Sequence, residues 1–152
     1  RCTAPLFVDP VSTVKAEKLT GLLSRIHTLK PNRIEAELLS GVKITDNATL
    51  HQAAQALLDQ GVQRVFLSLG GDGVLAAQQG KSHLEPICKA EMRNATGAGD
   101  AMMASLVWSF LAGRDLAESC AAGTAAAAIA VESEETINPN MSAEAVLARA
   151  AK

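Results

Sequence analysis

Short apolar runs alternate with longer amphipathic segments along the first 70 residues, and this alternation limits the fold more than any other feature of the sequence. Three runs are typical of short buried strands, at Leu6–Val8, Ile26–Leu29 and Val62–Leu69. The segments between them repeat their apolar residues every three or four positions, which predicts helices. Strands that alternate with helices predict an α/β fold: a doubly wound, mainly parallel sheet with helices on both faces and right-handed crossovers.

Capping residues and glycines mark the expected ends of the helices in this first half. The first helix would begin at Ser12 or Thr13 and bury the apolar residues Val14, Leu19, Leu22, Leu23 and Ile26. The second would show Ile34, Leu38 and Leu39 on one face and close at Gly41. The third would run from Asp46-Asn47 to Gln60 and stop at Gly61.

The second half of the chain is expected to be helical from Gly97 onward. Before that point, Gly70–Gly73 joins the third strand to Val74–Ala77, which predicts a hairpin, and residues 82–87 predict an edge strand. The expected helices are Ala98–Leu111, Leu116–Val131 and Ser142–Ala151. Because no repeat or long linker is present, we expect a single domain over residues 1–152. With so few strands, it resembles half of a larger sheet, with an exposed edge near the amino terminus.

Composition excludes several classes of protein. The 152 residues are 48% apolar and 20% charged, with a formal net charge of −2, which describes a globular domain that needs no disulfide or metal to hold its core. The absence of a basic cluster argues against a nucleic acid polymer as partner. Only 3% of the residues are aromatic and none is tyrosine, so the chain cannot stack several bases.

Cysteines and apolar stretches indicate the compartment. Cys2, Cys88 and Cys120 are odd in number and widely spaced, so we expect free thiols in a reducing cytoplasm. The most apolar stretch, Ala121–Val131, is too short to span a bilayer, so we expect no membrane segment. The sequence opens at Arg1 without methionine and without a signal peptide, which we interpret as truncation or processing.

The segment most informative about chemistry is Asn94-Ala95-Thr96-Gly97-Ala98-Gly99-Asp100, directly ahead of a predicted helix. Small residues at a helix start let backbone N–H groups converge on an anion such as a phosphate. Asp100 is unusual there, because a carboxylate repels phosphate unless the reaction needs a base beside it. This pairing favours phosphoryl transfer to a hydroxyl. The alternative is a tight glycine turn in which Asp100 merely caps the helix.

Residues 94–104, NATGAGDAMMA, resemble the second signature of the ribokinase-like (PfkB) carbohydrate and nucleoside kinases. Four further strings agree with that family in order and spacing: FVDPVS at 7–12, TLKPNRIE at 28–35, SLGGDG at 68–73 and Asn138-Pro139. The resemblance covers the whole chain but only the C-terminal half of the family's fold. It implies ATP-dependent phosphorylation of the 5'-hydroxyl of a nucleoside or sugar. It also implies that the N-terminal substrate and lid half is missing, so that the isolated chain would have little or no activity.

Carried over residue by residue, the resemblance gives the glycine-rich segment a catalytic role. It makes Asp100 the base that takes the proton from the acceptor hydroxyl as this attacks the γ-phosphate of ATP. The backbone N–H groups of Gly97, Ala98 and Gly99 would form the anion hole. Loss of Asp100 should then abolish turnover more than ATP binding.

Asn32 and Glu35 match the family's N-x-x-E motif, which implies a role near magnesium and phosphate, usually through water. Three residues apart at a helix start, they share one face, and a carboxylate with an amide suits hydrated Mg²⁺. Without the resemblance, Glu35 reads as an ordinary first-turn acid and Asn32 as an N-cap.

Two further places are implied to contact the nucleotide. The first is the strand-end loop, with Ser68, Gly70, Gly71, Asp72 and Gly73, for which a plain hairpin turn is the structural alternative. The second is Thr124, near the nucleobase in related kinases; here a buried threonine that bonds its own helix explains the residue at least as well.

Potassium is in doubt, because family members that use it often carry aspartate where this chain has Asn94. The acidic run Glu132–Glu135 reads as a solvated loop rather than a replacement. Two other functions stay open: a kinase for ribose, fructose phosphate or another nucleoside, and a non-catalytic nucleotide-binding module that uses its open sheet edge for a partner. That edge could also pair two copies into a homodimer.

Overall fold

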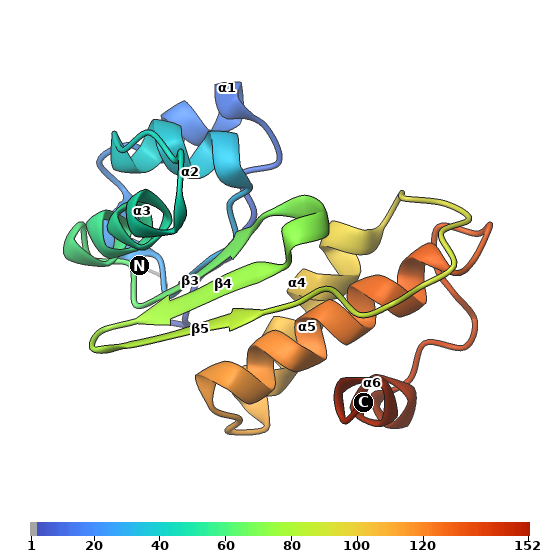
Figure 1. The fold of residues 1–152 in the computed structure, drawn as a ribbon. Coiled ribbons are helices and arrows are strands. Elements are labelled where there is room, and N and C mark those ends of the chain that lie inside the picture. Colours follow the sequence, from blue (N-terminus) through green and yellow to red (C-terminus); the bar gives the residue numbers. More distant parts are fainter. Residues whose placement is uncertain (1–2) are drawn as a thin grey trace. The chain divides into compact units, whose positions relative to one another are not determined.

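The computed structural model describes residues 3–152, which form two compact units (Figure 1). The first unit contains the residues up to Gly70 together with Leu75–His83, and the second contains Gly71–Val74 and Leu84–Lys152. The strands are β1 (Phe7–Val8), β2 (Thr28–Leu29), β3 (Arg64–Ser68), β4 (Val74–Gln78) and β5 (Lys81–Glu85). The α-helices are α1 (Thr13–Ala16), α2 (Arg33–Ser40), α3 (Asn47–Asp59), α4 (Ala98–Leu111), α5 (Leu116–Val131) and α6 (Ala143–Ala150).

The strands form one sheet in the order β1-β2-β3-β4-β5. β1 and β2 run parallel, as do β2 and β3, with Thr28 opposite Arg64 and Leu29 opposite Val65. β4 and β5 are joined by only two residues, a length that allows only an antiparallel pair. The predicted α/β class is confirmed, and β5 is the predicted edge strand. The predicted hairpin is β3 and β4, which are neighbours in the sheet and are joined by the short segment that contains Gly70–Gly73. β1 lies at the sheet edge among the strands that the structure describes, where an exposed edge was expected.

The core of the first unit lies between the sheet and its helices. Val65 and Leu67 of β3 belong to the same buried cluster as Ala53 and Leu57 of α3. Phe66, which points to the opposite face of the sheet, is also buried. Burial of three consecutive residues is typical of a central strand. The strand itself, though not its central position, was predicted from the apolar run Val62–Leu69.

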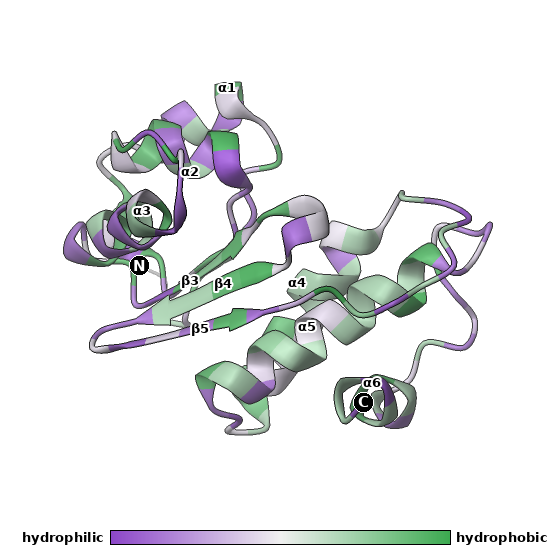
Figure 2. Cartoon of the chain, in the orientation of Figure 1, coloured by the Kyte–Doolittle hydropathy of each residue, from purple (hydrophilic) through white to green (hydrophobic). Residues whose placement is uncertain are grey.

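The second unit is built on helices α4, α5 and α6. α5 is hydrophobic along most of its surface (Figure 2) and buries twelve of its sixteen residues. At Gly123 of α5, an added Cβ atom would lie 3.2 Å from the Met102 side chain of α4, so the absence of a side chain lets these two helices pack closely. The C-terminal half of α5 contacts Val146 of α6 through a cluster of small apolar residues. The predicted bounds of α4 and α5 are confirmed residue by residue.

The first predicted helix is wrong beyond its opening turn. Ser12 is the N-cap, as expected, but α1 ends at Ala16 and only two 3₁₀ turns follow, at Glu17–Leu19 and Leu23–Arg25. The cause is a type II turn: Thr20 has φ −56° and ψ 122°, Gly21 has φ 86°, and the Leu22 N–H bonds the Leu19 carbonyl. Glycine at the position that needs a positive φ ends the helix despite its apolar periodicity.

Candidate functional site

The amino terminus of α4 presents backbone N–H groups that no side chain caps. Gly97 is the N-cap, with a left-handed φ of 88°, and its carbonyl accepts the first helical bond from Ala101 at 2.8 Å. The N–H groups of the first turn have no acceptor inside a helix, and here no capping side chain supplies one. Uncapped N–H groups and the positive end of the helix dipole are what an anion site at a helix start requires, and anion binding here stays a prediction.

Asp100 stands at the third position of α4, yet it does not cap the helix. In α2, α3 and α5 the residue at this position reaches back to the N-cap backbone and completes a capping box. No such bond exists at α4, and Asp100 is exposed. The alternative in which Asp100 acts as a helix cap is therefore wrong. Its carboxylate stays available beside the first-turn amides.

A pocket of about 560 Å³ opens beside this helix end, and Gly97 and Asp100 line it. Its other walls come from one face of α4 as far as Trp108, from Ala126 and Ala130 of α5, from the start of α6, and from Thr136, Ile137, Asn138 and Met141 in the loop between α5 and α6. The hydroxyl of Ser105 lines it too; this side chain is 6% exposed and its oxygen has no hydrogen-bond partner. The size is within the range of small-molecule sites.

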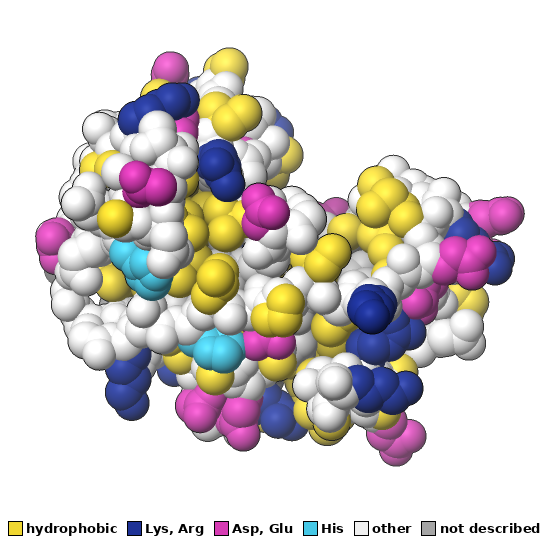
Figure 3. Space-filling view, in the orientation of Figure 1, with side chains coloured by type: hydrophobic (Ala, Val, Ile, Leu, Met, Phe, Trp, Pro, Cys, Tyr) yellow, Lys and Arg dark blue, Asp and Glu magenta, His cyan; other side chains and the backbone are white. Residues whose placement is uncertain are grey.

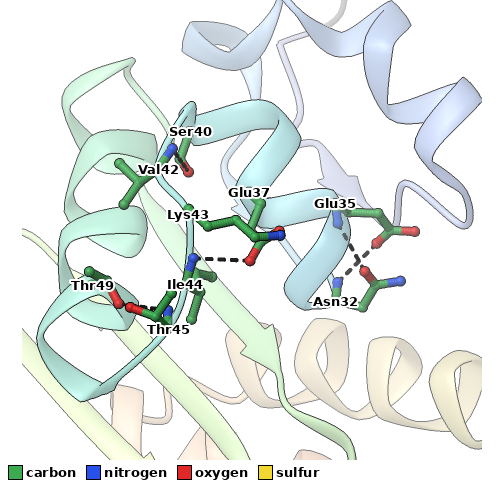
Figure 4. Close-up of polar contacts among 9 residues, drawn as sticks. All are labelled: Asn32, Glu35, Glu37, Ser40, Val42, Lys43, Ile44, Thr45 and Thr49. Atoms are coloured by element: carbon green, nitrogen blue, oxygen red, sulfur yellow. Dashed lines mark hydrogen bonds and ion pairs between the residues drawn. The ribbon is translucent and has the colours of Figure 1, made fainter.

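Asn32 and Glu35 form the capping box of α2 (Figure 4). The Asn32 N–H donates to Glu35 Oε2, and the Glu35 N–H donates to Asn32 Oδ1, both at 2.9 Å. Glu35 is only 2% exposed, and its second oxygen, Oε1, is buried without a partner. The alternative in which Asn32 is an N-cap and Glu35 a first-turn acid is therefore confirmed. The unpartnered oxygen leaves one hard ligand for water or Mg²⁺.

Ser68 lies beside this box at the carboxyl ends of β2 and β3. Its N–H donates to the Pro31 carbonyl at 2.9 Å, and Asn32 pairs with Ser68 as an isolated parallel bridge. Three residues of the predicted nucleotide and magnesium sites, Asn32, Glu35 and Ser68, therefore gather at one sheet edge, where ligands of α/β sheets commonly bind. Asp100 and the α4 amides belong to the other unit.

The glycines of the loop after β3 differ in backbone conformation and in the space around them. Gly73 has φ 99°, and an added Cβ atom would collide with the carbonyl of Glu85, so packing alone explains this glycine. Gly70 has φ 62°, whereas Gly71 does not need a positive φ, and both face open space. Asp72 is exposed. Contact of this loop with a nucleotide stays a prediction.

Thr124 is 5% exposed, and its hydroxyl donates to the Ala121 carbonyl of its own helix at 3.0 Å. This is the alternative in which a buried threonine bonds its own helix. A contact of Thr124 with the nucleobase stays a prediction. Cys88 lies 3.7 Å from the same hydroxyl. Cys88 and Cys120 are free thiols, as expected, and burial raises the pKa of Cys120 to about 12. Cys2 lies outside the described residues.

Sequence reasoning missed three polar contacts that organise these sites. Lys30, with a side chain 7% exposed, pairs with Asp9 at 2.6 Å, next to the ends of β2 and β1. This ion pair could have been predicted from the sequence, because Asp9 and Lys30 directly follow two neighbouring parallel strands and carry opposite charges. Asn138, quoted above without a role, donates from Nδ2 to the Ile129 carbonyl at 2.6 Å and fixes the loop after α5. The third contact, made by Asn94, joins two loops forty residues apart.

On the face shown in Figure 3, basic side chains are interspersed with acidic ones. Within residues 3–152, no three His, Cys, Asp or Glu side chains gather to hold a metal ion. No helix in that range is long and apolar enough to cross a membrane.

Comparison with known proteins agrees with this geometry. Residues 1–143 match the model of the pfkB family of carbohydrate kinases. Pseudouridine kinase of Escherichia coli is 42% identical over 139 residues, 91% of this chain and 44% of that protein. Ribokinase of Arabidopsis thaliana, solved with ribose and ATP, has a TM-score of 0.81 at 26% identity, over 97% of this chain and 47% of that one.

A third comparison shows the fold alone. Phosphofructokinase-2 of Escherichia coli, solved with potassium, has a TM-score of 0.75 at 23% identity, over 91% of this chain and 43% of that one. This chain thus spans less than half the length of each of these relatives. The family match covers nearly all of its residues, and it includes the glycine-rich turn, Asp100 and the N-x-x-E pair. The chain therefore belongs to the pfkB family of carbohydrate kinases.

Proposed function

We propose that the protein containing this chain transfers the γ-phosphate of ATP to the 5'-hydroxyl of a nucleoside, with pseudouridine as the leading substrate. The observation that carries the proposal is Asp100, an exposed carboxylate beside uncapped first-turn amides at the edge of a pocket. The choice of nucleoside rests on the 42% identity to pseudouridine kinase.

In this proposal, Asp100 accepts the proton of the acceptor hydroxyl while the hydroxyl oxygen bonds the γ-phosphorus. The bond from the γ-phosphorus to the bridging oxygen breaks, and ADP leaves. The N–H groups of the α4 first turn stabilise the negative charge on the transferred group, because they already point outward and need no reorganisation. An amide acceptor at position 100 could not take the proton.

Family membership implies Mg²⁺, and the residues at the sheet edge suit it. Glu35 offers a buried, unpartnered oxygen, and the adjacent Asn32 adds an amide. Since Mg²⁺ retains much of its water, two protein groups are enough to position it. We propose that this pair holds hydrated Mg²⁺, which would neutralise phosphate charge during transfer.

The catalytic assignment is tested with Asp100→Asn in the natural full-length protein, assayed with labelled ATP. We expect kcat to fall about 10²- to 10⁴-fold, the usual contribution of a general base, while ATP affinity changes little. Glu144→Gln is the matched control, because it neutralises another exposed first-turn acid, on α6. An unchanged rate in Asp100→Asn would remove the base from the proposal.

The magnesium assignment is tested with Glu35→Gln, because glutamine can still complete a capping box. We expect ATP binding by the variant to need about tenfold more Mg²⁺. The single tryptophan, Trp108, lines the pocket, so its fluorescence can follow ligand binding. An unchanged Mg²⁺ dependence would contradict the assignment.

A substrate panel separates the remaining functions. Transfer to pseudouridine above ribose and fructose phosphate supports the nucleoside, and the reverse order would reassign the acceptor. Nucleotide binding without transfer to any acceptor would favour a non-catalytic module. A cytoplasmic location and a homodimer through the β1 edge stay predictions.

A further inference from the structure

The side chain of Asn94 joins the two loops that frame the start of α4. Its Oδ1 accepts a hydrogen bond from the Thr96 N–H at 2.9 Å, and its Nδ2 donates to the Glu134 carbonyl at 3.1 Å. The two loops meet again at Gly97, where an added Cβ atom would lie 2.7 Å from the Thr136 carbonyl oxygen. The turn that carries the proposed anion hole therefore rests on the loop after α5 at these two points, in addition to the backbone bonds from the Arg93 and Asn94 N–H groups to the Val131 carbonyl at the end of α5.

The chemistry of these two partners fixes the orientation of the Asn94 amide. The Thr96 N–H can only donate, and the Glu134 carbonyl can only accept. A flipped amide would place donor against donor and acceptor against acceptor. The position therefore needs one acceptor and one donor in a single side chain, which an amide has and a carboxylate lacks.

An aspartate here would face the Glu134 carbonyl with an oxygen, and a cation could then bridge the two oxygens. In this chain the Nδ2 donor already occupies that place, so the residues at this junction do not fit a bound monovalent cation. Potassium accompanies the related phosphofructokinase-2 structure, but nothing in this contact calls for it here.

We propose that Asn94 is a positioning residue for the transfer reaction: its two hydrogen bonds order the turn before α4, so that ordering needs no monovalent cation. The inference rests on the proposed function for its catalytic consequence. Its structural part, a turn held without potassium, stands on the two contacts alone.

The structural part is tested on the 152-residue chain by amide hydrogen exchange in potassium chloride and in tetramethylammonium chloride of equal ionic strength. For the unsubstituted chain we expect the same exchange rate of the Thr96 amide in both salts. For Asn94→Ala in tetramethylammonium chloride we expect exchange of the Thr96 amide about tenfold faster, because alanine has no acceptor for this N–H and a net hydrogen bond is lost. Potassium-specific slowing in the unsubstituted chain, or unchanged exchange in Asn94→Ala, would overturn the proposal.

The catalytic part is tested in the full-length protein. Asn94→Asp should lower kcat about tenfold and leave the KM for ATP within about twofold, because a displaced turn misaligns the reacting groups more than it weakens binding. Asn140→Asp, on the loop before α6, makes the same amide-to-carboxylate change and should leave both parameters unchanged. An unchanged kcat in Asn94→Asp would refute the positioning role. If the unsubstituted protein transfers no phosphate at all, the proposed function fails, while the exchange result still decides the structural part.

Discussion

The backbone conformation at the start of α4 requires glycine at position 97. Its φ is 88°, and a Cβ atom there would lie 2.7 Å from the Thr136 carbonyl oxygen. We expect Gly97→Ala to lower the free energy of unfolding by about 3 kcal/mol, because backbone strain and a steric clash act together. Gly113 is the matched control, with φ 70° and nothing within 4 Å, so Gly113→Ala should cost only about 1 kcal/mol. Urea denaturation measures both, and equal losses would contradict a role for the Thr136 contact.

Residues also differ in how far their surroundings could be predicted from the sequence. The position of Asp100 followed from its own segment, because the glycine turn and the helix that place it are contiguous. The contact of Asn94 with Glu134 did not, because it depends on where a loop forty residues away comes to lie. The sequence alone indicated a departure at Asn94, and only the fold shows what the amide bonds.

Among the elements, α2 shows where periodicity misleads. The sequence predicted an apolar face with Ile34, Leu38 and Leu39, yet Ile34 is 64% exposed and Leu38 41%, whereas Glu35 is buried with Leu39. The capping box explains the difference: Glu35 must turn back toward Asn32, and this fixes the rotation of the first turn. The predicted ends of α4 and α5 were right because clear turn residues flank both helices.

α6 is attached to its unit by an ion pair, which makes part of the stability depend on pH. Arg149 donates to both carboxylate oxygens of Glu132, at 3.0 and 2.9 Å, and also to the Lys89 carbonyl. The hydrogen bond from Arg149 is the main cause that lowers the pKa of Glu132 below its ordinary 4.5. Because the pKa of Glu132 is lower in the folded chain than in the unfolded chain, the ion pair stabilises the fold fully at pH values above the ordinary pKa of 4.5. This stabilisation is lost as the pH falls through the lower, folded-state pKa.

We therefore expect Glu132→Gln to reduce the free energy of unfolding by about 1 kcal/mol at pH 7, since the pair is partly exposed. The difference from the unsubstituted chain should shrink as the pH falls from 5 to 3. Thermal unfolding at a series of pH values measures it. Glu144→Gln, in the first turn of α6, is the control: its free energy of unfolding should differ less from that of the unsubstituted chain, and the difference should change less with pH. A Glu132→Gln effect that grows in acid would mean that the sign of the pKa shift is wrong.

At the scale of the whole molecule, the chain carries the residues proposed for magnesium binding and for proton transfer, but it spans only 44% of pseudouridine kinase. The resemblance places the contacts to the acceptor largely in the other half of the family's fold. We therefore expect the isolated chain to bind ATP with Mg²⁺ but to phosphorylate pseudouridine at least about 10³-fold more slowly than the full-length protein, because an acceptor that is not held in place loses the advantage of proximity. Labelled phosphate transfer measures the rate, and Trp108 fluorescence confirms that nucleotide is bound in the same sample. Turnover by the chain alone at the full-length rate would show that these 152 residues already hold the acceptor, and the pocket beside Asp100 would then be the first place to seek it.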